Sequence, residues 1–170
     1  HEREGASGRS PAQDRRGPVI TAKREHEICA GHRVAGHESK CAHLHGHGYV
    51  ITFHCRGALD GIGRVLDFSV MKARLCEWLE ENWDHRTLLW TEDEVMRSVR
   101  TIVLTETDMD ELKLLDRSIV WVPFNPTAEN MAHYLLHEVG PRQLAGTGVT
   151  LFRVDVQETR KCSATAELAT

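Results

Sequence analysis

The chain of 170 residues contains no apolar run close to the roughly 20 residues that a membrane-spanning helix needs. Its first residues also lack the apolar core of a secretory signal peptide. Neither sign of charge dominates, because the formal net charge is only -4, so the balance does not favour nucleic acid or a membrane surface as a partner. Together these absences predict a soluble, cytoplasmic protein.

The cysteines do not form a disulfide framework, because their number is odd and their spacing is irregular. They are Cys29, Cys41, Cys55, Cys76 and Cys162. With no sign of secretion, we expect free thiols in a reducing compartment.

Internal repeats and low-complexity runs are absent as well. The length suits one domain, which we place at residues 19–170. Residues 1–18 are polar and rich in glycine, and we interpret them as a flexible leader or an expression remnant.

Histidine is abundant: the chain has eleven, and three of them stand within five positions, at His43, His45 and His47. Residues 44–55 have the pattern of a strand, whose period of two places His45 and His47 on one face. Their Cα atoms would lie about 7 Å apart on a rigid element. Two imidazoles in this arrangement can bind one metal ion, and zinc prefers such ligands.

A third ligand is available at His32, which ends the strand predicted over residues 19–32. The connection at residues 36–40 has the composition of a turn, so the two strands can pair antiparallel and bring His32 beside His45 and His47. Three imidazoles leave a fourth position open for water or substrate, as in catalytic zinc sites. Two alternatives stay open: Cys41 as a fourth ligand of a closed site, and His43 in place of one of the three.

Periodicity elsewhere predicts an α+β fold, in which an antiparallel sheet carries two helices on one face. One helix is expected at residues 68–82. A second is announced by residues 123–127, where Thr127 or Asn125 is available as the cap, and ends at Gly140 and Pro141. The remaining strands are expected at residues 64–68, 117–122 and 149–158, with a possible hairpin partner at 162–168. Residues 91–118 are strongly charged and receive no assignment. Such a sheet has exposed edges, which association with other copies would cover.

Three residues have side chains suited to proton transfer. Cys41, close to histidines in sequence, is a candidate base or nucleophile if it is held as a thiolate. Asp84 is positioned in sequence to orient His85 or to stabilise its imidazolium. The alternative for Asp84 and His85 is a solvated exit from the preceding helix, with no role in chemistry.

Three further residues are candidates for binding a ligand. Glu158 continues the apolar face of the last long strand, and a carboxylate can accept two parallel hydrogen bonds from adjacent N–H groups. Its simpler interpretation is an ion pair with Arg160 or Lys161 at the strand end. Glu129 is most simply explained by the helix dipole and Thr127 by an N-cap.

Five separated motifs resemble the 6-pyruvoyltetrahydropterin synthase and 6-carboxytetrahydropterin synthase family, in the family's order and over about residues 23–168. The motifs are Ala30-Gly31-His32-Arg33, Cys41-x-x-x-His45-Gly46-His47, Asp84-His85-Arg86, Pro126-Thr127-Ala128-Glu129-Asn130 and Glu158-Thr159. The resemblance implies a tunnelling fold, whose subunits join their sheets into a barrel as a homotrimer or a pair of stacked trimers. Active sites in such assemblies lie at subunit boundaries.

The resemblance also implies roles for single residues. His32, His45 and His47 would bind zinc, and Cys41 would be the base that abstracts a proton.

The other motifs supply the rest of the implied site. Asp84 and His85 would complete the proton relay, Glu158 would anchor the pterin ring, and Thr127 and Glu129 would help to hold it.

The three residues between Cys41 and His45 resemble the bacterial carboxytetrahydropterin branch. The implied reaction converts 7,8-dihydroneopterin triphosphate to 6-carboxytetrahydropterin, with release of acetaldehyde and triphosphate, for 7-deazaguanine and queuosine synthesis. The alternatives are a pyruvoyltetrahydropterin synthase, which only eliminates triphosphate, and a non-catalytic module assembled around zinc. Residues 91–121 form a longer segment than compact family members have, which would reshape the mouth of the site or a subunit contact.

Overall fold

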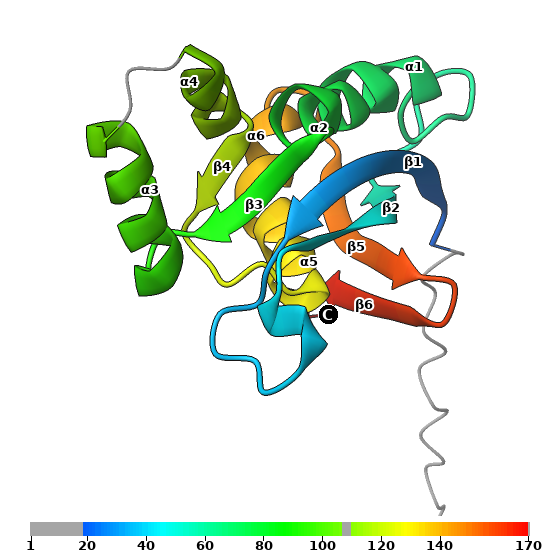
Figure 1. The fold of residues 1–170 in the computed structure, drawn as a ribbon. Coiled ribbons are helices and arrows are strands. Elements are labelled where there is room, and N and C mark those ends of the chain that lie inside the picture. Colours follow the sequence, from blue (N-terminus) through cyan, green and yellow to red (C-terminus); the bar gives the residue numbers. More distant parts are fainter. Residues whose placement is uncertain (1–18, 107–109, 170) are drawn as a thin grey trace, which may run out of the picture.

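A computed structural model describes residues 19–106 and 110–169, and its centre is one curled, six-stranded sheet (Figure 1). The leader expected at residues 1–18 lies outside the described residues. The strands are β1 (Thr21–His32), β2 (His45–Arg56), β3 (Arg86–Trp90), β4 (Ile119–Val122), β5 (Thr150–Thr159) and β6 (Cys162–Glu167). Their order across the sheet is β4-β3-β1-β2-β5-β6.

The two histidine-bearing strands pair antiparallel, as the turn-rich connection between them predicts. The register places His32 opposite His45 and Ala30 opposite His47. Buried residues alternate along β2, where Tyr49, Ile51 and Phe53 all have 0% exposure. This period of two directs one face of the sheet into the core and leaves the other face to solvent.

Two long helical stretches cover the buried face, in agreement with the sequence. The first comprises α1 (Phe68–Met71), the π-helical η2 (Lys72–Cys76) and α2 (Glu77–Asn82). The second comprises α5 (Ala128–Tyr134), the π-helical η3 (Leu135–Val139) and α6 (Gly140–Gln143). Their buried stripes and the inner face of the sheet form one hydrophobic core.

The sheet is mixed, whereas the sequence predicts an antiparallel one. β3 pairs parallel to β1, and β4 pairs parallel to β3. Parallel neighbours need a crossover connection, and α3 (Glu94–Glu106) and α4 (Asp110–Arg117) lie in the chain between β3 and β4. Figure 1 shows these two helices at one end of the molecule, beside β4. The strand β3 is absent from the sequence prediction, although Leu88 and Leu89 in its centre are buried.

Two assignments predicted from the sequence are wrong, one strand and one helix end. The predicted strand at residues 64–68 is a bend, in which the Asp60 carboxylate accepts hydrogen bonds from the backbone N–H and the side chain of Arg64. The second helical stretch does not end at Gly140 and Pro141 but continues to Gln143, with Pro141 directly after the junction between η3 and α6. No helix among the residues described is long and apolar enough to cross a membrane.

Candidate metal centre and adjoining cavity

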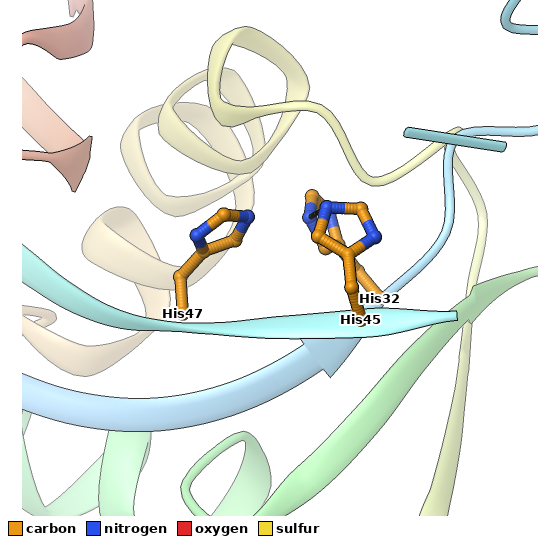
Figure 2. A group of neighbouring side chains, drawn as sticks. All are labelled: His32, His45 and His47. Atoms are coloured by element: carbon orange, nitrogen blue, oxygen red, sulfur yellow. Dashed lines mark hydrogen bonds between the residues drawn. The ribbon is translucent and has the colours of Figure 1, made fainter. Parts of the chain in front are cut away.

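The imidazoles of His32, His45 and His47 converge on one point. One ligand atom from each lies within 4.8 Å of those of the other two. Figure 2 shows the three rings rising from the same side of the two strands, His32 from β1 and the others from β2. The antiparallel register produces this cluster, since it places the end of β1 beside the start of β2.

Hydrogen bonds at the far side of two rings determine which nitrogen faces the centre. His32 Nδ1 lies 2.7 Å from the carbonyl oxygen of Pro126, and His45 Nδ1 lies 2.8 Å from that of His43. A carbonyl only accepts, so each Nδ1 carries the proton and each Nε2 of the neutral ring presents a lone pair. The two Nε2 atoms are 3.1 Å apart. Facing lone pairs at this distance need a cation or a proton between them, which fits a metal site.

The surroundings of His47 and the burial of His32 agree with this interpretation. His47 Nε2 is buried and has no hydrogen-bond partner among the described residues. Burial is the largest influence on His32, whose pKa lies below its ordinary value of 6.5 although the Pro126 carbonyl and the Glu158 charge oppose the shift. A neutral imidazole is the form that binds a metal. The three histidines can therefore form a metal site.

Cys41 lies in a cavity next to this centre. The cavity has a volume of about 310 Å³, and its lining includes Cys41, Thr127, Glu129 and Glu158. Four of the residues that the sequence predicts for catalysis and substrate binding thus lie around one space. Cys162, for which the sequence predicts no role, lines it too.

Cys41 does not belong to the group of converging metal ligands. Among the described residues, that group contains only the three histidines. Cys41 is half-buried in η1 (Lys40–Ala42), a 3-10 turn whose position is fixed by a 2.8 Å hydrogen bond from the Val34 N–H to the Cys41 carbonyl. His43 is exposed and contributes its backbone carbonyl rather than its ring.

Glu158 connects the cavity to the histidines. Its Oε1 atom lies 3.4 Å from His32 Nε2 and 3.6 Å from His47 Nε2, and its side chain is 25% exposed. The carboxylate thus borders the metal centre on one side and the cavity on the other. The sequence suggests Arg160 or Lys161 as simple ion-pair partners, whereas the structure places the carboxylate beside the two histidine rings.

Tyr49 adjoins the histidine centre but is not among the residues predicted from the sequence. It lies two positions after His47 on the same face of β2, and its ring centroid is 5.9 Å from that of His32 and 5.5 Å from that of His47. Burial, followed by the negative charge of Glu158, raises the pKa of Tyr49 far above its usual value. The strand period that links His45 to His47 also reaches Tyr49, and this signal would have identified it.

Thr127 and Glu129 lie at the start of α5. Thr127 is the N-cap, since its hydroxyl accepts a hydrogen bond from the Asn130 N–H at 3.3 Å. Glu129 is exposed in the first turn, where the helix dipole favours a carboxylate. The N-cap predicted at Thr127 is therefore confirmed, Glu129 lies in the first turn as predicted, and both residues also line the cavity.

Asn125 holds the loop before α5 against the end of β1. Its side-chain amide exchanges two hydrogen bonds with the backbone of Ala35, at 2.9 Å and 2.8 Å. Because Pro126 follows directly, this clamp fixes the carbonyl that orients His32.

Asp84 and His85 lie apart from the cavity. Asp84 accepts hydrogen bonds from the Cys29 N–H at 2.8 Å and from His85 Nδ1 at 2.7 Å. Burial would raise the pKa of Asp84, but these two hydrogen bonds and the charge of His85 lower it. His85 has a left-handed backbone, with φ of 54°, and an 81% exposed side chain. A strained backbone that presents an oriented, exposed imidazole is characteristic of functional sites.

The hollow beside His85 lies on the other face of the sheet. Its lining includes Cys29, Gly31, Gly46 and Gly48, which alternate along the strands with the histidine ligands, and it also reaches Ala30 and His47. Successive strand residues point to opposite faces. Within one chain, the structure therefore brings Asp84 and His85 together but does not bring them to Cys41.

The sequence and the fold both have known relatives. Residues 21–169 match the family described as 6-pyruvoyl tetrahydropterin synthase. A protein of Rickettsia felis named 6-carboxy-5,6,7,8-tetrahydropterin synthase is 32% identical over 145 residues, which cover 85% of this chain and 97% of that protein. A Halobacterium salinarum protein named as a probable enzyme of the same kind is 32% identical over 127 residues, or 73% of this chain and 74% of the relative.

Solved structures show the same architecture. An uncharacterized protein of Wolinella succinogenes, WS1659, has a TM-score of 0.79 at 23% identity, covering 90% of this chain and 100% of that one. The 6-pyruvoyl tetrahydropterin synthase of Caenorhabditis elegans has a TM-score of 0.60 at 22% identity, covering 89% and 97%.

The curled sheet and its helices define a tunnelling-fold protein with a candidate three-histidine metal centre. The chain belongs to the 6-pyruvoyl tetrahydropterin synthase family, a family of enzymes that act on small pterin molecules. The resemblance found in the sequence motifs is thereby confirmed.

Proposed function

We propose that this chain is a zinc-dependent carbon–carbon lyase, a 6-carboxy-5,6,7,8-tetrahydropterin synthase. It would convert 7,8-dihydroneopterin triphosphate to 6-carboxytetrahydropterin, releasing acetaldehyde and triphosphate for 7-deazaguanine and queuosine synthesis. The observation that carries the proposal is the convergence of three imidazoles beside a cavity that contains a thiol and a carboxylate. The names of relatives that are 30–32% identical over most of the chain support it.

The donor set fits zinc. Three imidazoles converge on one point, the Nδ1 atoms of His32 and His45 are turned to backbone carbonyls, and the group contains no cysteine that would close the site. His32, His45 and His47 would hold the ion. When bound, zinc supplies Lewis acidity that makes a C–H bond next to the substrate's coordinated hydroxyls easier to deprotonate.

The residues around the cavity would handle the substrate. Glu158 would accept two hydrogen bonds from adjacent N–H groups of the pterin ring, with Thr127 and Glu129 at the cavity wall beside it. Cys41 would remove a proton from the side-chain carbon. Its half-buried position on the same cavity gives the thiol access to a bound molecule.

The relay through His85 would require a second copy of the chain. Asp84 holds the Nδ1 proton of His85, which leaves Nε2 as the basic nitrogen that points outward. Within a single chain, His85 and Cys41 border different hollows. Each complete site would therefore combine Cys41 of one copy with His85 of a neighbour. A homotrimer or a homohexamer would provide such boundaries.

Product analysis tests this function and its nearest alternative. The zinc-loaded protein is incubated with 7,8-dihydroneopterin triphosphate, and the products are identified by mass spectrometry. We expect 6-carboxytetrahydropterin and acetaldehyde, whereas a product that keeps the complete side chain after loss of triphosphate would indicate a pyruvoyltetrahydropterin synthase.

The two thiols of the cavity provide a matched pair of variants. Cys41→Ala should keep zinc and abolish acetaldehyde release, and Cys162→Ala should retain it. Full activity of Cys41→Ala would remove this thiol from the mechanism. A sulfur ligand in zinc-edge spectroscopy of the wild type would instead favour a closed, non-catalytic zinc module.

A further inference from the structure

Tyr49 places a polar atom in the core without an evident partner. The residue has 0% exposure, and its hydroxyl oxygen makes no hydrogen bond of ordinary geometry among the described residues. Buried hydroxyl groups are almost always paired, because desolvation without a compensating hydrogen bond is costly. The position of this hydroxyl beside the histidine centre therefore requires an explanation.

The ring of Tyr49 packs where Glu158 and the histidines meet. Its centroid lies 5.9 Å from that of His32 and 5.5 Å from that of His47. The Glu158 carboxylate lies 3.4 Å and 3.6 Å from Nε2 of the same two rings. Tyr49 and Glu158 thus contact the same pair of histidines, one through its ring and the other through Oε1.

The His32 ring does not supply Glu158 with a hydrogen-bond donor. The Nδ1 proton of His32 is directed to the Pro126 carbonyl, so Nε2 of the neutral ring offers a lone pair and not a hydrogen. A metal ion on the three rings would occupy the Nε2 lone pairs and leave those atoms without hydrogens. The Tyr49 phenol has a hydrogen to donate, and its ring packs against the same two histidines that the Glu158 carboxylate approaches.

We propose that Tyr49 is a positioning residue, whose phenol donates a hydrogen bond to Glu158 and so holds the carboxylate at the edge of the metal centre, facing the cavity. The oxygens on the cavity side then meet the adjacent N–H groups of a ligand in a fixed orientation. The role of Glu158 as the ligand anchor rests on the proposed function, whereas its hydrogen bond with Tyr49 is independent of that function.

Ligand binding provides the first test. The zinc-loaded wild type, Tyr49→Phe, Glu158→Gln and the double variant are titrated with 7,8-dihydroneopterin, which carries no triphosphate and is not turned over. Tyr49→Phe should raise Kd about tenfold, as expected when one hydrogen bond that orients a carboxylate is lost. In the Glu158→Gln background, Tyr49→Phe should raise Kd by less than about a further twofold, because the carboxylate that Tyr49 positions is already absent.

Two further readouts separate positioning from a structural role. Zinc content should stay unchanged, and in turnover KM should rise about tenfold while kcat changes less than about threefold. Tyr134→Phe removes the other tyrosine hydroxyl of the chain, away from the histidines, and should leave Kd unchanged. The proposal would be overturned if Tyr49→Phe bound the ligand with wild-type affinity. It would also be overturned if the increase in Kd of the double variant equalled the product of the two single increases.

Thermal unfolding tests the pairing even if the pterin proposal fails. Should the wild type not bind 7,8-dihydroneopterin, the proposed function fails, and the Tyr49 pairing is judged by Tm alone. Tyr49→Phe should lower Tm by roughly 3–6 °C in the wild type and by about 1 °C or less in the Glu158→Gln background. A Tm that rises or stays the same on loss of the hydroxyl would show that the phenol has no partner.

Discussion

At the scale of single residues, the metal centre depends on backbone carbonyls as much as on histidine spacing. The Pro126 and His43 carbonyls fix the protonated nitrogens of His32 and His45, which turns the opposite nitrogens toward the centre. His43 and His45 are close in sequence but differ in role, since only the ring of His45 joins the cluster.

This difference gives a matched pair of variants for metal binding. His45→Ala removes one of three ligands and should weaken zinc binding by more than about 100-fold, beyond what loss of an outer hydrogen bond costs. His43→Ala keeps the backbone carbonyl and should bind zinc as the wild type does. Competition with a chromophoric chelator measures both affinities, and equal losses in the two variants would place the ion elsewhere.

The buried position of His32 predicts how stability depends on pH in the metal-free chain. Its pKa is lowered in the folded state, so below about pH 6.5 the unfolded chain binds a proton before the folded chain does. The free energy of unfolding should therefore fall as pH drops from about 6.5 toward the folded-state pKa, and then level off. Urea unfolding in the presence of a chelator, at about pH 8 and about pH 5.5, measures the decrease.

Two substitutions test the origin of this pH dependence. His32→Asn removes the titrating group and should reduce the decrease, whereas His133→Asn, at an exposed position on α5, should preserve it. A pH dependence that is the same in His32→Asn and the wild type would assign the effect to other groups.

At the scale of secondary-structure elements, the contact between α6 and β5 limits which residues the helix can carry. A Cβ atom at Gly140 would lie 3.1 Å from Leu151 Cβ and closer still to Leu151 Cδ2. The helix is continuous here, with ordinary right-handed backbone at Gly140. The glycine is thus required by close packing and not by its backbone angles.

Gly140→Ala should therefore destabilise the protein, although alanine normally favours a helix by about 1 kcal/mol over glycine. Overpacking against Leu151 should cost about 1–3 kcal/mol in the free energy of unfolding, measured with urea. Gly61→Ala is the control, since a Cβ there would meet nothing within 4 Å. An increase in stability for Gly140→Ala would show that β5 can shift away from the helix at little cost.

At the scale of the whole molecule, the two faces of the sheet carry different parts of the proposed site. The metal centre and Cys41 lie on the side covered by helices, and His85 lies beside the hollow on the other side. Exposed apolar side chains of α4, Leu114 and Leu115, border a second hollow next to His85. A neighbouring copy seated there would bury them.

Mixing inactive subunits tests whether sites are shared between copies. Cys41→Ala and His85→Ala should each be inactive alone. If every site combines Cys41 of one copy with His85 of another, unfolding and refolding an equal mixture should restore about a quarter of the sites. Activity of the mixture that stays at the level of the separate variants would place both residues of each site in one chain.

The local pattern of the sequence was sufficient to predict most elements and the histidine centre. Strands with a period of two, at β1 and β2, place His32, His45 and His47 on one face, and the turn-rich connection implies their pairing. This information is local, because side-chain direction in a strand follows directly from position along the chain.

The tertiary structure decided what depends on distant contacts. The parallel pairing of β3 and β4 follows from a crossover, and the local pattern at residues 64–68 was overruled by the Asp60 and Arg64 bend. Contacts between segments far apart in sequence place the Pro126 carbonyl on His32 and the buried Tyr49 ring beside His32. They also put His85 and Cys41 at different hollows. Packing of the whole chain sets such contacts, and no local periodicity encodes them.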